Sequence, residues 1–207
     1  MTAQRLFLTL TIGLHSLTLY CQSIKDYFIP DSTHNKMSYY HLSPTGQRVD
    51  WTGSFYYTKK NTTYDVMKAQ MMQGDITAVQ TMTIKFTKNE VKMIKSVSTT
   101  MTEKNHKVEY NPPSIILKLP PAGQTISWSY KDITGENVQC TALWTTVEIN
   151  GTEKKAIKKV MQYSKMKTKL TEYYVINIGF WQSEMEGAEG RFTFQKFDGL
   201  DYDATAK

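Results

Sequence analysis

Candidate catalytic residues are few in this 207-residue sequence, and their spacing matches no common catalytic or metal-binding pattern. Beyond an apolar first segment the histidines are His34, His41 and His106, and none forms the H-E-x-x-H pattern of a zinc site. The chain has no G-x-S-x-G sequence for a serine nucleophile and no Gly-rich phosphate-binding loop. Histidines scattered in this way are typical of surface or turn positions. We therefore predict no catalytic residue, no metal site and no cofactor.

Two sets of carboxylates come closest to a chemical pattern. Asp198, Asp201 and Asp203 lack the spacing and the closing glutamate of a calcium loop, so a solvated acidic tail is the simpler interpretation. Glu184 and Glu186 share one face of a strand, which would suit glycoside hydrolysis. Solvent exposure explains both glutamates more simply, and a hydrolase is therefore the third candidate function.

The methionines indicate binding more than catalysis. A methionine side chain adapts to apolar partners of varied shape. Five of them lie in strand-like segments: Met67, Met71, Met82, Met93 and Met101. If they line the concave face of an open barrel, we expect them to hold an acyl chain or another apolar ligand. An ordinary, closely packed core is the alternative.

Three tyrosine doublets suit a contact surface. Adjacent residues of a strand point to opposite faces, so each doublet places one ring outside and one inside. An outer tyrosine suits contact with a protein partner or a glycan. The doublets are Tyr39-Tyr40, Tyr56-Tyr57 and Tyr173-Tyr174.

The elements that must position these side chains are β-strands. Residues 49–59 are rich in the aromatic and β-branched side chains that strands prefer. Residues 76–88 alternate between apolar and polar, residues 91–102 continue the pattern, and the two segments predict a long hairpin. Tight turns are predicted at Gln73-Gly74, Thr134-Gly135 and Asn150-Gly151. The pattern predicts an all-β, antiparallel fold.

Residues 64–73 and 153–166 also fit the spacing of an amphipathic helix. We predict strands for both, because the Asn150-Gly151 turn calls for a returning strand and lysines protect a sheet edge. Proline-rich pieces at residues 111–113 and 119–123 predict loops or a sheet edge, between two parts of one sheet system. We therefore expect a single domain over residues 24–198 and a frayed tail over residues 199–207.

The first segment predicts export. Residues 1–23 have one basic residue, Arg5, then about 15 mostly apolar residues and then small ones, which is typical of a secretory signal peptide. Two processing sites fit: cleavage after Ser23, or acylation of Cys21 as the first residue of a lipoprotein, although Tyr20 suits the second poorly. We expect a periplasmic or cell-envelope protein. If Cys21 is acylated, we expect that residue to anchor the protein to the outer membrane. Cys140 then has no disulfide partner, and we expect it to be a buried apolar residue.

Composition limits the partners. With 40% hydrophobic and 21% charged residues the chain is globular, and its net charge of +6 favours an anionic membrane surface. Nucleic acid is excluded as a partner, because an exported chain without a binding motif has no route to it. A solvated, lysine-rich surface with no partner is the simpler alternative.

Four stretches resemble exported, β-rich proteins of Gram-negative bacteria of the Bacteroidetes type: SIKDYFIP, PPAGQTISWSY, VEINGTEKKAIK and EYYVINIGFWQSEM. The resemblance implies a curved antiparallel sheet that forms an open or half barrel, similar to the lipoprotein carriers of the periplasm. A two-sheet β-sandwich is the alternative fold. The leading function is then a non-enzymatic envelope protein that binds an apolar or lipid-like ligand, or a protein partner, on a sheet face. A structural subunit of an envelope assembly without a small ligand is the second.

Overall fold

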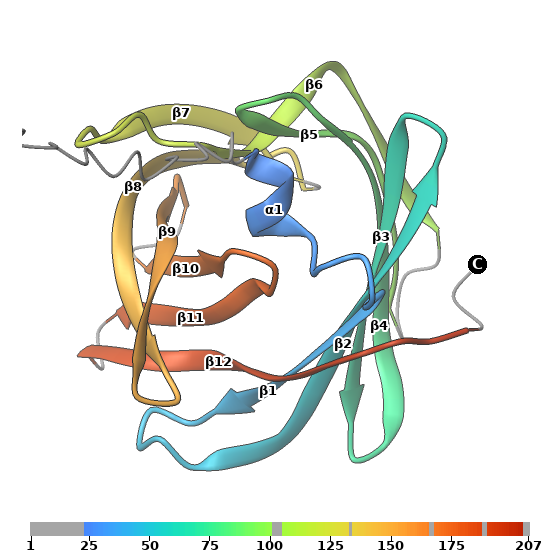
Figure 1. Ribbon diagram of the computed structural model, residues 1–207. Coiled ribbons are helices and arrows are strands. Elements are labelled where there is room, and N and C mark those ends of the chain that lie inside the picture. Colours follow the sequence, from blue (N-terminus) through green and yellow to red (C-terminus); the bar gives the residue numbers. More distant parts are fainter. Residues whose placement is uncertain (1–22, 101–104, 133, 166–167, 188–189, 205–207) are drawn as a thin grey trace, which may run out of the picture.

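A single antiparallel sheet of twelve strands curves round until its two edges nearly meet, in the computed structural model of the protein (Figure 1). The structure describes residues 23–100, 105–132, 134–165, 168–187 and 190–204. The first six strands are β1 (Lys36–Leu42), β2 (Arg48–Lys60), β3 (Thr63–Met72), β4 (Asp75–Phe86), β5 (Glu90–Thr100) and β6 (His106–Lys118). The last six are β7 (Ile126–Lys131), β8 (Asn137–Ile149), β9 (Thr152–Tyr163), β10 (Lys169–Val175), β11 (Gly179–Gly187) and β12 (Gly190–Asp201). A short helix, α1 (Ile24–Phe28), precedes them.

The strand order is β6-β5-β4-β3-β2-β1-β12-β11-β10-β9-β8-β7, and neighbouring strands in this order pair antiparallel. The predicted open barrel is therefore confirmed, and the β-sandwich alternative is wrong. Both segments that also fitted a helix are strands, β3 and β9. Asn150 and Gly151 take φ values of +50° and +75° between β8 and β9, as a two-residue hairpin turn requires.

The sheet opens where the prolines lie. Its two edges are β6 and β7, which follow one another in the chain and are joined through Pro120 and Pro121. Side chains bridge this seam: the Trp128 indole N–H donates to the Ile115 carbonyl at 2.7 Å, and the Ser114 hydroxyl donates to the Lys131 carbonyl at 3.4 Å. The proline-rich pieces thus mark an edge within one sheet, as predicted.

Helix α1 closes one end of the barrel, and the strand pattern did not predict it. Ile24, Tyr27 and Phe28 are buried, and the Ile24 amide donates to the Lys88 carbonyl at 3.2 Å. Gly179 accommodates the helix: its φ is +84°, and a Cβ there would lie 3.0 Å from the Phe28 carbonyl oxygen. No helix among the described residues has the length and apolar character needed to cross a membrane.

The predicted frayed tail over residues 199–207 is wrong for its first part. Strand β12 continues to Asp201, where Leu200 pairs with Met37 of β1. Beyond the strand, Asn35 and Asp203 exchange two hydrogen bonds of 2.8 and 2.6 Å between side chain and backbone. Long-range pairing with β1 therefore orders a segment whose glycine and aspartates suggested a loop. Residues 205–207 and 1–22, including Arg5 and Cys21, lie outside the described residues.

Candidate functional site

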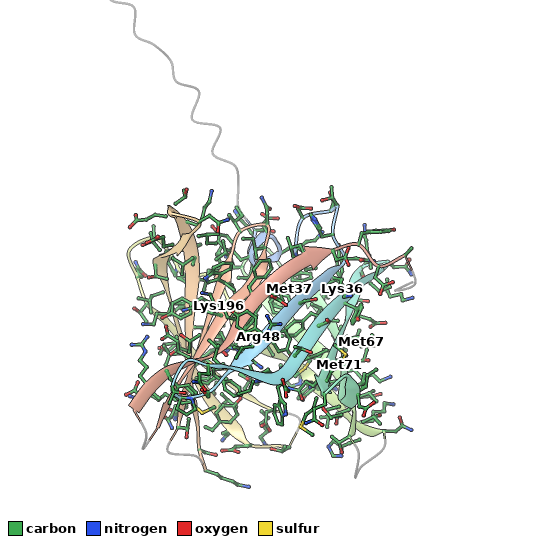
Figure 2. The ribbon with its side chains drawn as sticks, turned by 90° about the horizontal axis from the view of Figure 1, so that it is seen from below. Lys36, Met37, Arg48, Met67, Met71 and Lys196 are labelled. Atoms are coloured by element: carbon green, nitrogen blue, oxygen red, sulfur yellow. The ribbon has the colours of Figure 1, made fainter. Side chains whose placement is uncertain are left out.

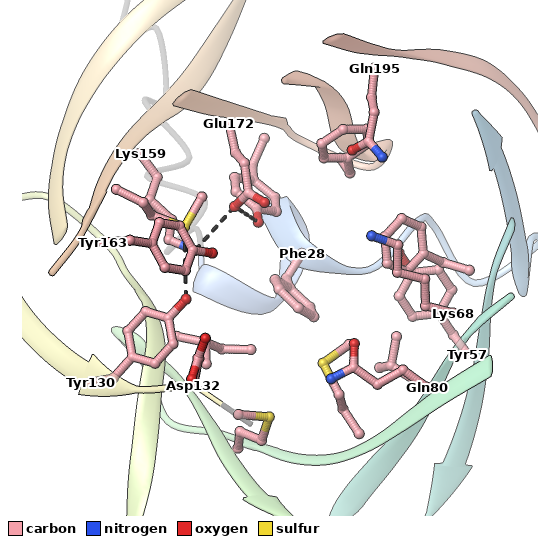
Figure 3. A pocket seen from close by; sticks show the side chains of 18 residues that line it. Phe28, Tyr57, Lys68, Gln80, Tyr130, Asp132, Lys159, Tyr163, Glu172 and Gln195 are labelled. Carbon is pink, nitrogen blue, oxygen red and sulfur yellow. Dashed lines mark hydrogen bonds and ion pairs between the residues drawn. The ribbon is translucent and has the colours of Figure 1, made fainter. Parts of the chain in front are cut away.

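An internal cavity of about 270 Å³ lies near the barrel axis, against Phe28 of α1 (Figure 3). Alternate residues of most strands reach it, because every second side chain of a barrel strand points inward. Its lining residues are Phe28, Phe55, Tyr57, Val66, Lys68, Gln80, Met82, Met93, Ile116, Tyr130, Asp132, Lys159, Met161, Tyr163, Glu172, Tyr174, Phe180 and Gln195.

The wall formed by β2 to β6 is mostly apolar. Its polar groups come from Lys68, Gln80 and the Tyr57 hydroxyl, and the Gln80 amide already donates to the Ser96 hydroxyl at 3.0 Å. Lys68 is the exception: within the described chain its ammonium has neither a hydrogen bond nor an ion pair. It lies instead 5.6 and 5.5 Å from the ring centres of Tyr39 and Phe55. Burial lowers the pKa of Lys68, and the more distant Glu172 carboxylate opposes that shift.

The opposite wall carries a buried ion pair. The Lys159 ammonium lies 3.1 Å from Glu172 Oε2, with 5% and 20% of the two side chains exposed, and the Tyr174 hydroxyl donates to the same oxygen at 2.6 Å. Burial alone would raise the pKa of Glu172, but Lys159 and Tyr174 together lower it. The pair therefore stays ionised, and its charges satisfy each other (Figure 3).

A second cavity of about 590 Å³ adjoins the first and shares Lys68 and Gln80 with it. Its other lining residues come from strand ends and turns away from α1: Gln70, Ala78, Val79, Ser98, Thr99, Thr100, His106 and Thr134. Lys68 thus lies between an inner cavity closed by α1 and a wider one at the other end of the barrel.

Three solved structures are similar to the chain. A candidate lipoprotein of Parabacteroides distasonis is 10% identical with a TM-score of 0.44, over 84% of this chain and 98% of its own. A candidate exported protein with a YmcC-like fold from Bacteroides fragilis is 12% identical with a TM-score of 0.45, over 84% and 99%. A β-barrel-like protein with a domain of unknown function from Brucella abortus is 9% identical with a TM-score of 0.35, over 81% and 96%.

Two of these three come from Bacteroidetes and are described as exported or lipoprotein. No family model matches the chain. No curated protein matches it either. At this level of similarity nothing about a ligand or an activity transfers to this protein.

The structure divides the predicted methionine site. Met82 and Met93 line the inner cavity. Met67 and Met71 do not: Val66 and Lys68 point inward, so Met67 between them points outward, and Met71 pairs with Ile76, which is 63% exposed. Figure 2 shows both residues on the side of the barrel that β2 and β3 form. The expectation that these two line the concave face is wrong. Met101 lies outside the described residues.

The residues proposed for hydrolysis do not converge. Glu184 lies 3.2 Å from the Tyr173 hydroxyl and pairs with Arg191, while Glu186 is half exposed and 3.9 Å from Lys169. His41 lies on β1 instead, and its side chain is buried. Among the described residues, no three histidine, cysteine, aspartate or glutamate side chains lie close enough together to hold a metal ion. Cys140 is buried as predicted, and burial raises its thiol pKa to about 11.

The predicted surface or turn position of His41 is wrong, because only 2% of this residue is exposed. Its ring lies 4.9 Å from Phe194 and 5.5 Å from Trp51, and its Nε2 is 3.1 Å from the Gln195 amide nitrogen. Burial, helped by the nearby Lys68 charge, lowers the pKa of His41 to about 4. His41 is therefore neutral at physiological pH.

We expect acid to destabilise the fold through His41. Between pH 6.5 and about pH 4 the unfolded chain binds a proton that folded His41 does not, so stability falls as pH falls through this window. The loss attributable to His41 should be about 2–3 kcal/mol between pH 7 and pH 4. Urea unfolding at several pH values, for the wild type and His41→Gln, measures it. Equal pH slopes for the two proteins would contradict the assignment.

Proposed function

We propose that this protein is a non-enzymatic, exported cell-envelope protein that holds an apolar or lipid-like ligand inside its barrel. The observation that carries the proposal is the inner cavity, walled on the β2–β6 side by Val66, Met82, Met93 and Ile116. Ligand sites are typically concave and mostly apolar, with a few placed polar groups. At about 270 Å³ the cavity is near the small end of the usual range of roughly 300–1,000 Å³.

The start of the fold supports a processing site upstream of Ser23. Ile24 is fully buried and its amide is hydrogen bonded, and the Ser23 amide donates to Asp26 Oδ2 at 2.9 Å. Cleavage after Ser23 would remove that bond and place a charged α-amino group on buried Ile24, which is costly. Acylation at Cys21 avoids both effects. We therefore propose a lipid-anchored form in the cell envelope over the soluble one.

Native mass spectrometry of the protein purified from its own envelope fraction tests the proposal. We expect a co-purifying apolar molecule with the wild type, and an intact mass that fits a chain beginning at Cys21 with its acyl groups. Met82→Gln combined with Met93→Gln should lose the ligand, because two amides would then face the apolar wall.

Met67→Gln combined with Met71→Gln is the matched control, since it makes the same chemical change on the outer face of the barrel. This variant should retain the ligand. Urea unfolding of both variants separates ligand loss from unfolding. A wild-type protein that is always empty, and that takes up no apolar molecule afterwards, would favour the purely structural role instead.

A further inference from the structure

The inner cavity contains one cation without an anionic partner. Lys159 is neutralised by Glu172 at 3.1 Å, and the Asp132 carboxylate accepts bonds from its own turn, from the Thr134 and Glu136 amides at 2.9 Å each. Lys68 alone, among the described residues that line the cavity, is a charged group with no counter-charge in contact. Lys68 is partly buried, and a charge held largely away from water is costly unless something pairs with it.

The position of Lys68 sets the orientation in which an amphipathic ligand would bind. The residue borders both cavities, with the apolar wall of Val66, Met82, Met93 and Ile116 on one side and the wider second cavity on the other. An amphipathic molecule with its head at Lys68 would bury its tail along that wall, toward Phe28. The inner volume of about 270 Å³ has room for roughly nine groups of about 30 Å³ each, the volume that a water molecule occupies and close to that of a methylene.

We propose that the ligand is an unbranched carboxylic acid of about ten carbons, with its carboxylate paired to Lys68 and its chain in the inner cavity. This inference rests on the proposed function and specifies its ligand. A carboxylate brings one negative charge, which balances Lys68. A phosphate head brings closer to two, and Glu172 and Asp132 on the facing wall would repel the second.

Calorimetric titration of the delipidated protein with decanoate, 1-decanol and decyl phosphate at pH 7.5 tests the proposal. Decanoate should bind the wild type at least tenfold more tightly than decanol or decyl phosphate. Lys68→Met should weaken decanoate binding about 10–100-fold, since it removes a charged hydrogen-bond donor, and should leave decanol binding unchanged. Lys68→Arg should restore most of the preference.

Lys85→Met is the control, because Lys85 is an exposed lysine on neighbouring β4 and its loss changes the net charge equally. Lys68→Met should fold at least as well as the wild type, since it removes an unpaired charge from the interior, and urea unfolding checks this. Equal binding of decanoate and decanol would overturn the carboxylate assignment and leave an apolar site. A preference for decyl phosphate would overturn it as well, and would assign a phosphate head to Lys68 instead. Binding of none of the three would overturn the proposed function as well.

Discussion

Replacing Glu172 with glutamine should lower the free energy of unfolding by about 3–5 kcal/mol. The change leaves the Lys159 ammonium, only 5% exposed, without its partner at 3.1 Å. It also weakens the acceptor of the 2.6 Å bond from the Tyr174 hydroxyl. The cost is large because a buried cation cannot recover its hydration inside the barrel. Urea unfolding followed by tryptophan fluorescence measures the change at pH 7.

Two further variants separate charge from packing. Glu172→Leu combined with Lys159→Met should regain most of the lost stability, because a buried ion pair and a well-packed apolar pair are often close in free energy. Glu186→Gln removes a carboxylate from the same sheet, but one that is 54% exposed, and should cost less than about 1 kcal/mol. A loss for Glu172→Gln as small as that for Glu186→Gln would mean that water reaches the pair.

Replacing Phe28 with alanine should cost about 3–5 kcal/mol and lengthen the inner cavity. The Phe28 ring is 9% exposed, stacks on Tyr174 at 5.8 Å and meets Phe86 edge-on at 6.0 Å. It also lines the cavity, so its loss extends the space available to a ligand chain. Urea unfolding measures the stability, and titration with acids of ten and twelve carbons measures the change in preferred length.

Phe28→Leu is the conservative comparison, since it keeps most of the apolar volume and should cost less than about 1.5 kcal/mol. The alanine variant should move the preference toward the longer acid, and the leucine variant should not. If the urea midpoint of unfolding of the alanine variant equals that of the wild type, helix α1 does not close the barrel in solution.

The sequence predicted the strands well because alternation is a local property. In β4 the apolar residues Met82, Ile84 and Phe86 stand out against Thr83 and Lys85, so its inner face could be identified without a partner strand. Strand β3 could not be oriented in this way. Its two faces carry similar mixtures of apolar and polar residues. Assigning Met67 and Met71 to the inner face was therefore wrong, and an error of this kind reverses the inward or outward assignment of every side chain in the strand.

Lys68 and the Lys159–Glu172 pair were missed for the same physical reason. A lysine in a strand is normally read as solvent exposed, and only the pairing of β9 with β10 brings Glu172 beside Lys159. Helix α1 is too short for periodicity to reveal it. The pairing of β1 with β12, which orders residues 199–201, joins parts of the chain about 160 residues apart and leaves no local signal.

The strand order relates the fold to a simpler barrel by circular permutation. Read from β7, the neighbours run β7 to β12 and then β1 to β6. The first and last strands, β1 and β12, therefore lie side by side in the middle of the sheet, and the sheet's free edges are β6 and β7. The protein is thus a circular permutant of a plain up-and-down meander. Every ladder but one is a local hairpin, and assembly depends on a single distant encounter, between β1 and β12.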